Sequence, residues 1–574
     1  MKKGGGGDFG VRRTNRALLI KSDSNEPYMK SSFWSLTTAL IFIVFFFFMI
    51  IPVISLFTGS FQVEEGGRFS LENYANFAKY PSYWRSFSHS IVIGLISAAG
   101  AILIGVPMGF MVARWNVMGK PLIITLSTLP LMLPTFIAAF AWIILLGRGG
   151  IVTKYLEALG IQVGSIYGYP GMILVFVSQL YSYVFLMTLS GFSSIDESLE
   201  EASRSLGASP LRTFIKVSFP LVLPSILSGA LLTFMSAIEN FGVPMVIAQQ
   251  TPNLVVKAYV EFTSEVGKHP GMAYTLSVIL IFITMASLIV QRYYLSKRNF
   301  IQAARGKPLV KQLTPGKRLA ASAMIYAVLI FTLIPFFVAF ILSFMEMRGP
   351  VFYPKFSLQS YIYAFERSAR PIFNTYFLAT VATIASVLIG VPTGYILTRR
   401  KSIYSSMLDI VIMLPFVIAG TILGIALITF FNKGWLVLTG TWMILALSYV
   451  IRKMPFIARS SASILYQLDP SLDEASISLG VSPMKTFYKV TFRLMMAGIV
   501  SGAILSWVTV ISELSSTIVL QTPGWSTMTV EMYQGIISDD LGKAAAFSSI
   551  MIISTVIPLL LVTKYFSKDQ TSLL

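Results

Sequence analysis

Apolar residues gather along this chain into long runs that are separated by short polar stretches. A helix that crosses a bilayer needs about 20 mostly apolar residues, so each run predicts one transmembrane helix. Proline and glycine inside several runs are compatible with spanning, because neighbouring helices can satisfy the freed backbone groups. The predicted spans are 34–60, 89–113, 121–146, 170–192, 220–247 and 272–291, followed by 319–344, 374–398, 405–430, 437–460, 494–520 and 544–565.

The composition agrees with an all-α, polytopic membrane protein of about 12 transmembrane helices. Hydrophobic residues make up 55% of the 574 residues and charged residues only 12%, against about 25% charged in soluble domains. Cysteine is absent and only two histidines occur. We therefore predict no disulfide framework, no metal site and no bound cofactor.

The net charge of +19 lies in particular segments rather than over the whole chain. Basic residues crowd the polar N-terminal tail (1–33), a central linker (293–318) and loops on the same predicted side. Such loops face the cytoplasm by the positive-inside rule. This pattern predicts membrane lipid rather than nucleic acid as the surroundings of the chain, and it places both termini in the cytoplasm.

The chain is an internal duplication. The stretch Phe69–Tyr74 recurs at Phe356–Tyr361, and Ile104–Arg114 recurs at Ile389–Arg399. The offset falls from 287 to 285 and later to 273, so the first half gained about a dozen residues, which we assign to the loop 147–168. Each repeat holds an even number of spans, so repeats 34–292 and 319–574 are predicted to be parallel six-helix bundles with one orientation.

A polar cassette between the fourth and fifth spans occurs in both repeats, at Glu200–Gly229 and Asp473–Gly502. Ser194 and Glu197 have the spacing of a capping box. A short apolar stripe, a glycine stop and a Ser-Pro restart then predict a helix–turn–helix on the cytoplasmic face. The stripe is Leu199, Ala202 and Leu206 before Gly207 in the first copy, and Leu472, Ala475 and Leu479 before Gly480 in the second.

A short helix of this kind suits docking into a groove of another protein. For a single copy, an inert loop resting on lipid headgroups would be the favoured interpretation. Two copies at equivalent positions favour contact with a two-fold symmetric partner.

The cassette resembles the EAA loop of ABC importer permeases, with Glu201-Ala202-Ser203 and Glu474-Ala475-Ser476 at its core. The second copy departs from the family pattern at Arg493, where proline is expected. The resemblance implies two ATP-binding ABC subunits, an extracytoplasmic solute-binding protein and the cell membrane of a prokaryote. The ATPase-coupling residues that it implies are Glu201, Ala202, Gly207, Glu474, Ala475 and Gly480.

No G-x-x-x-x-G-K-[ST] phosphate loop is present, so the chain itself is predicted not to be an enzyme. The fused format and the stretches around Glu239 and Glu513 look most like iron(III)-type permeases, so ferric iron is the first expectation for the solute. Thiamine, a phosphonate, a phosphorylated sugar or a polyamine are the alternatives. A secondary transporter driven by an ion gradient is the alternative class, but it needs no matched docking loops.

Polar residues inside predicted spans are costly and mark functional candidates. Glu239 and Asn240 lie in the fifth span of the first repeat, and Ser512, Glu513 and Ser516 lie at the matching place in the second. We expect these residues to line the translocation path, where carboxylates favour a cationic or metal-bearing solute. The alternative is that they are hydrogen-bond partners between helices or lie near a helix end.

Overall fold

The computed structural model describes residues 32–63, 69–162, 164–264, 270–296, 310–348, 351–400 and 402–566. The predicted N-terminal tail up to residue 31 and the middle of the predicted linker, 297–309, lie outside these ranges. Within them the chain is almost wholly helical, with one antiparallel hairpin formed by β1 (Met345–Arg348) and β2 (Val351–Phe356). Below, the first half means residues 32–296 and the second half residues 310–566.

The first half consists of helices alone in its described residues. A π-helical turn, Phe46–Ile50, joins α1 to α2, and a second one, η3 (Phe214–Ser218), joins α10 to α11. The helices are α1 (Ser32–Phe45), α2 (Ile51–Ser60), α3 (Glu72–Lys79), α4 (Pro81–Arg114), α5 (Lys120–Met132), α6 (Thr135–Leu146), α7 (Ile151–Ala158), α8 (Tyr169–Ser193), α9 (Glu197–Ser205), α10 (Pro210–Thr213), α11 (Phe219–Ile238), α12 (Gly242–Ile247), α13 (Leu254–Thr263) and α14 (Pro270–Ser296).

The second half repeats this order. Its π-helical turn η5 (Phe487–Thr491) corresponds to η3, and short 3₁₀ turns occur at Leu414–Phe416 and Pro523–Trp525. The helices are α15 (Pro315–Leu342), α16 (Gln359–Arg367), α17 (Ala369–Arg399), α18 (Ile403–Met413), α19 (Gly420–Phe431), α20 (Trp442–Gln467), α21 (Ser471–Ser478), α22 (Pro483–Thr486), α23 (Phe492–Leu494), α24 (Met496–Ile511), α25 (Thr517–Leu520), α26 (Met528–Ile537) and α27 (Leu541–Phe566).

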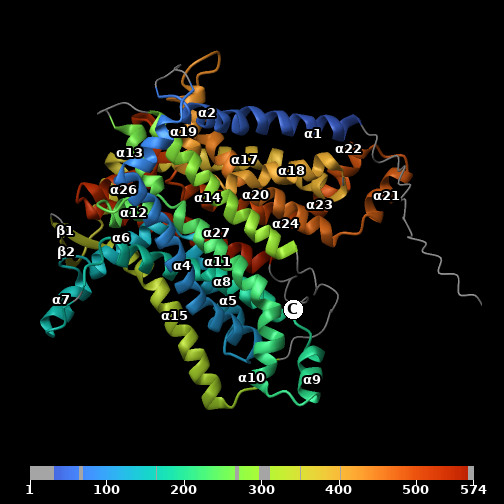
Figure 1. Cartoon of the computed structure of the whole chain (residues 1–574), viewed down its shortest axis with the longest axis horizontal. Helices are drawn as coiled ribbons and strands as arrows, with labels where there is room; N and C mark the ends of the chain where they lie inside the picture. The colour runs from blue at the N-terminus through green and yellow to red at the C-terminus, as the bar shows by residue number, and fades with distance from the viewer. Residues whose placement is uncertain are drawn as a thin grey trace, which may run out of the picture.

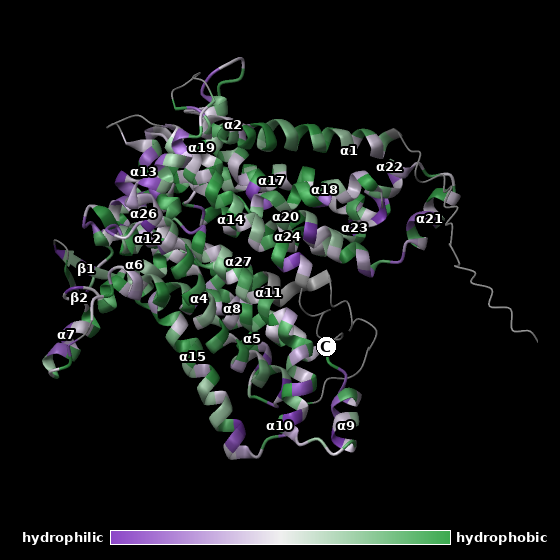
Figure 2. Cartoon of the chain, viewed as in Figure 1, coloured by the Kyte–Doolittle hydropathy of each residue, from purple (hydrophilic) through white to green (hydrophobic). Residues whose placement is uncertain are grey.

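The spans agree with the predicted runs but are less regular. In the described part of the chain, 9 helices are long and apolar enough to cross a membrane, and 11 if each of two bent pairs counts as one. The remaining predicted span is α20, which packs along α17 as α8 packs along α4 and which carries Arg452 and Lys453. Figure 2 shows that apolar residues predominate along most of these helices and that polar residues gather around α9 and α10.

Four predicted spans are broken in the structure, and two of these breaks lie beside prolines. The predicted span 121–146 divides into α5 and α6, and 405–430 bends by 105° between α18 and α19. Both breaks follow a Leu-Pro pair, at Pro130 and Pro415, where the proline ring removes a backbone donor and favours a break or a kink.

The loop 147–168 holds the residues gained by the first half. It joins α6 to α8 over 22 residues and contains α7, which projects from the body of the protein (Figure 1). The corresponding connection from α19 to α20 takes only the 10 residues 432–441. The difference of twelve residues accounts for the change of offset from 285 to 273.

The two halves exchange their first helices. Helix α1 packs against α17 and α18 of the second half, and α2 packs against α19 as well as against α14 of its own half. Helix α15 packs against α5 and α6 of the first half and against α27 of its own. Figure 1 shows α1 lying along one side of the second half and α15 along the first. A large cluster of buried apolar side chains runs through both halves, so the duplicated bundles share one core.

Candidate functional site

Each cassette forms two short helices with a glycine turn between them, as predicted. Gly207 has φ +82° and Gly480 has φ +83°, a conformation that costs glycine nothing but strains other residues. In the first copy, the Ser209 hydroxyl accepts a hydrogen bond from the backbone N–H of Arg212 and caps α10. The stop and restart signals therefore correspond to a real turn in both halves.

The predicted start of the first cassette helix is wrong by two residues. Ser194 is the C-cap residue of α8, where its Oγ donates to the carbonyl of Gly191 at 2.9 Å. Asp196 is the actual N-cap of α9, and its side chain accepts from the backbone N–H of Ser198. Ser194 cannot cap α9, because its hydroxyl serves the preceding helix.

The predicted coupling residues lie on the outer surface of the cassettes. Glu201, Ala202, Glu474 and Ala475 are exposed, and no other part of the described chain covers them. The last leucine of each apolar stripe is also outward, with Leu206 89% and Leu479 84% exposed. Both cassettes thus present an uncovered apolar edge that suits a protein partner better than the interior of this chain.

A buried ion pair anchors the first cassette from behind. Glu200, one residue before the predicted Glu201, accepts a 2.7 Å bond from Arg114 Nη2 at the end of α4. Its carboxylate also accepts a 2.7 Å bond from the Ser218 hydroxyl in η3. These three residues, called the first anchor below, join the cassette to the second and fifth spans.

The second cassette has an equivalent anchor, formed by Arg399, Asp473 and Thr491. The Thr491 hydroxyl donates to Asp473 Oδ1 at 2.6 Å, and Arg399 Nε lies 3.6 Å from Asp473 Oδ2. Sequence reasoning missed both anchors, because it treated Arg114 and Arg399 only as the last residues of a repeated motif. Their place at the end of a repeated motif, Ile104–Arg114 and Ile389–Arg399, was the available signal.

A second polar contact explains why both cassettes carry serine as the third residue of the Glu-Ala-Ser core. The Ser203 hydroxyl lies 3.0 Å from Thr213 Oγ1, and the Ser476 hydroxyl lies 2.9 Å from Thr486 Oγ1. Each contact ties the first short helix of a cassette to the second. The serine hydroxyl therefore makes a hydrogen bond that alanine could not make.

The predicted path residues lie at helix breaks rather than in the middle of spans. Helix α11 ends at Ile238 and α24 ends at Ile511. After each of these ends the backbone turns into a short buried helix. Asn240 Oδ1 accepts from the backbone N–H of Val243 at 3.0 Å, and Glu513 Oε1 accepts from that of Ser516 at 3.4 Å. Asn240 and Glu513 are thus equivalent in sequence and in structure, each capping the turn that follows its break.

These breaks from the two halves meet at one cavity of about 220 Å³. Glu239, Asn240, Ser512 and Glu513 line it, together with the break between α5 and α6. Ser516 is fully buried behind the lining, where its backbone N–H binds Glu513. Asn240 is also engaged with a neighbouring helix, since its Nδ2 donates to Thr135 Oγ1 at 3.0 Å.

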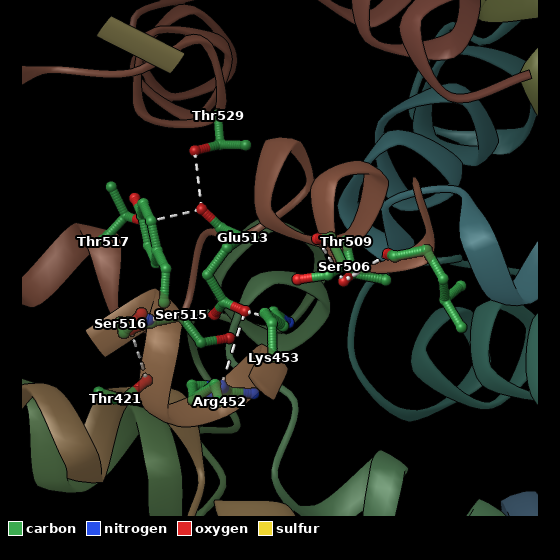
Figure 3. A network of polar contacts seen from close by, with 12 residues as sticks. Thr421, Arg452, Lys453, Ser506, Thr509, Glu513, Ser515, Ser516, Thr517 and Thr529 are labelled. Carbon is green, nitrogen blue, oxygen red and sulfur yellow. Dashed lines mark hydrogen bonds and ion pairs between the residues drawn. The ribbon is translucent and has the colours of Figure 1, made fainter. Parts of the chain in front are cut away.

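Two cations of α20 face the same cavity, and sequence reasoning did not single them out. Lys453 Nζ lies 2.7 Å from Glu513 Oε2, and Arg452 Nε lies 3.7 Å from the same oxygen (Figure 3). Gly420 makes room for Arg452, because a Cβ there would collide with the guanidinium. Two adjacent cations inside an apolar run were a signal as strong as the carboxylates.

The cavity is therefore nearly balanced in charge, with Glu239 and Glu513 facing Arg452 and Lys453. Hydroxyls hold the Glu513 backbone in place, since Thr517 and Thr529 both donate to its carbonyl, at 2.7 and 3.1 Å (Figure 3). Of the two carboxylates that line the cavity, Glu239 is the one without an ion pair or hydrogen bond within the described residues. Glu513 is thus neutralised by two cations of its own half.

Comparison with known proteins identifies the class of this chain. A family model described as the binding-protein-dependent transport system inner membrane component matches residues 101–299 and 386–569, once in each half. The chain belongs to this family and is the membrane-embedded component of such a transport system. The two matches agree with the duplication.

Individual relatives extend over most of the chain. It is 26% identical over 537 residues to the ferric transport system permease protein FbpB of Actinobacillus pleuropneumoniae, covering 89% of this chain and 75% of that protein. It is 22% identical over 485 residues to the Fe(3+)-transport system permease protein FbpB 2 of Haemophilus influenzae, covering 84% and 90%. The spermidine/putrescine transport system permease protein PotB of Haemophilus influenzae is 30% identical over 223 residues, covering 38% of this chain and 78% of PotB.

Proposed function

We propose that this chain is the permease subunit of an ATP-driven importer of ferric iron. The observation that carries the proposal is the similarity to ferric permeases over 89% and 84% of the chain, whereas the polyamine permease matches 38%. The solute is delivered by an extracytoplasmic binding protein. The two cassettes face the cytoplasm and each receives one copy of an ATPase subunit.

Uptake of radioactive Fe(III) by proteoliposomes tests this proposal, with the chain, its ATPase and its binding protein reconstituted together. We expect ATP-dependent accumulation of iron and none of spermidine or thiamine. Accumulation of spermidine but not of iron would show that the transported solute is a polyamine. Iron uptake driven by an ion gradient without any ATPase would favour a secondary transporter.

The path runs through the cavity between the two helix breaks. Support comes from the convergence of both halves on this cavity and from the cost of placing charged groups inside a membrane bundle. Because Lys453 and Arg452 pair with Glu513, Glu239 is the carboxylate that can meet a passing cation. Ser512 and Asn240 add polar groups to the wall, and Ser516 supports Glu513 from behind.

The test of this path is the variant Glu239→Gln, which keeps the shape of the side chain and removes its charge. We expect iron uptake to fall at least tenfold, the loss of about 1.4 kcal/mol of favourable interaction, with unchanged assembly. Glu157→Gln on α7, exposed and remote from the cavity, is the matched control. Full uptake by Glu239→Gln would remove Glu239 from the path.

A further inference from the structure

The first anchor connects the cassette helix α9 to the end of α4 and to η3, which precedes α11. Arg114 is the last residue of α4, Glu200 lies in α9, and Ser218 lies in η3 immediately before α11. All three residues are buried, with 5, 7 and 2% exposure. Separating a buried charge from its partner leaves that charge uncompensated, which is strongly unfavourable. A displacement of α9 that kept these contacts would therefore have to move the adjoining ends of the second and fifth spans with it.

The equivalent residues of the second half make the same three-way connection. Asp473 and Thr491 lie 273 residues after Glu200 and Ser218, and Arg399 lies 285 after Arg114. Asp473 and Thr491 are buried, and Arg399 is largely covered. The repetition of acid, arginine and hydroxyl at the same three places shows that the contact belongs to the architecture of the cassette.

The two anchors differ in tightness. The carboxylate of the first anchor lies 2.7 Å from both of its partners and 3.7 Å from Arg204. In the second anchor the shorter aspartate leaves a 3.6 Å gap to Arg399, whose Nη2 donates instead to the carbonyl of Leu468 at 2.8 Å. The fifth span behind it is also bent, by 72° between Leu494 and Met496, whereas Pro210–Ile238 forms one continuous helix in the first half.

We propose that Glu200 and Asp473 are positioning residues that transmit movement of the cassettes to the second and fifth spans, and that the first half transmits it more tightly than the second. This inference rests on the proposed function, because it assumes an ATPase that moves the cassettes. The exposed Glu201 and Glu474 contact that ATPase, and the buried acid beside each of them carries the movement inward.

The measurement is the number of solute molecules transported per ATP hydrolysed by the reconstituted complex. We expect Glu200→Gln to lower this ratio about fivefold or more, the lower end of typical coupling between sites, while the ATPase still binds and hydrolyses ATP. Asp473→Asn should lower it less. Asp473→Glu, which lengthens the side chain toward Arg399, should maintain or raise it, and Glu200→Asp should retain most of it.

Glu366→Gln on the exposed face of α16 is the control, because its carboxylate lies outside both anchors. Thermal unfolding and copurification of the ATPase report on structure alone. A complex that assembles and hydrolyses ATP with an unchanged ratio in Glu200→Gln would overturn the inference, and equal losses in both halves would overturn the asymmetry. Failure of the unmodified chain to bind any ATPase would instead contradict the proposed function.

Discussion

At the scale of single residues, the central cavity is lined by a buried ion pair. Glu513 is 6% exposed and is paired at 2.7 Å with Lys453. Taking both charges out of water costs several kcal/mol per ion, which their attraction offsets only while both partners are present. We therefore expect the pair to matter more for which arrangement forms than for overall stability.

Removing one member of this pair should be worse than removing both. We expect Lys453→Met to destabilise the protein by about 3–5 kcal/mol, because Glu513 keeps only the more distant Arg452. The double variant Lys453→Met with Glu513→Gln should recover much of that loss. Thermal unfolding in detergent measures both, and a single variant as stable as the unmodified chain would contradict this account.

Alanine substitutions at glycine turns can separate the effect of backbone strain on stability from an effect on ATP-coupled uptake. Gly207 and Gly160 have φ of +82° and +79°, and a Cβ on either would meet nothing within 4 Å. Alanine at either position should therefore cost about 1–2 kcal/mol of backbone strain. Only Gly207→Ala should also reduce ATP-coupled uptake, because Gly160 lies in the loop after α7. Equal uptake by the two variants would argue against a coupling role for this turn.

At the scale of the elements, equivalent helices of the two halves have diverged where the sequence departs from its repeat. The fifth span of the second half bends at Met495, two residues after Arg493, which stands where proline was expected. The loop 147–168 carries α7, but its counterpart 432–441 connects the same two spans with no helix. These differences leave the pairing of α4 with α8 and of α17 with α20 unchanged.

The α7 loop should accordingly be dispensable for folding. Replacing residues 147–168 by the sequence of 432–441 removes α7 and the buried side chain of Ile166. We expect a loss of about 1.5–3 kcal/mol, the usual contribution of one buried aliphatic side chain, and normal assembly in the membrane. Aggregation of the shortened chain during size-exclusion chromatography would show that the loop supports the bundle.

At the scale of the whole molecule, contacts between the halves are extensive and partly polar. Besides the exchanged helices α1 and α15, the Thr284 hydroxyl of α14 donates to the carbonyl of Val417 at 2.6 Å. The Thr429 hydroxyl of α19 donates to the Tyr274 hydroxyl of α14 at 3.2 Å. A shared apolar core also joins the two halves, so we expect them to associate without the covalent link.

Two separate chains, residues 1–303 and 304–574, should therefore assemble when they are produced together. We expect a tag on one chain to recover the other in equal amount, since α1 and α15 each bury an apolar face on the opposite half. The control is the first chain without residues 1–60, which lacks α1 and α2 and should bind its partner less well. Recovery of the tagged chain alone would mean that the linker is essential.

Much of the fold could be predicted because membrane spans and repeats leave local signals. The apolar runs located the spans to within a few residues in most cases, and the glycines at 207 and 480 marked turns with positive φ. The break at Glu239 could not be predicted in this way, because the apolar run continues through Gly242–Ile247. Hydropathy records that a residue is compatible with lipid, and it does not record where a helix stops inside a protein.

The sequence by itself determined the helical class, the duplication, the inserted loop and the two exposed cassettes, because each depends on neighbours along the chain. Only the tertiary structure decided that the first helices are exchanged, that Glu200 and Asp473 are anchored by Arg114 and Arg399, and that Lys453 neutralises Glu513. These contacts join residues that are far apart in sequence, and the burial that makes them strong exists only once the helices have packed.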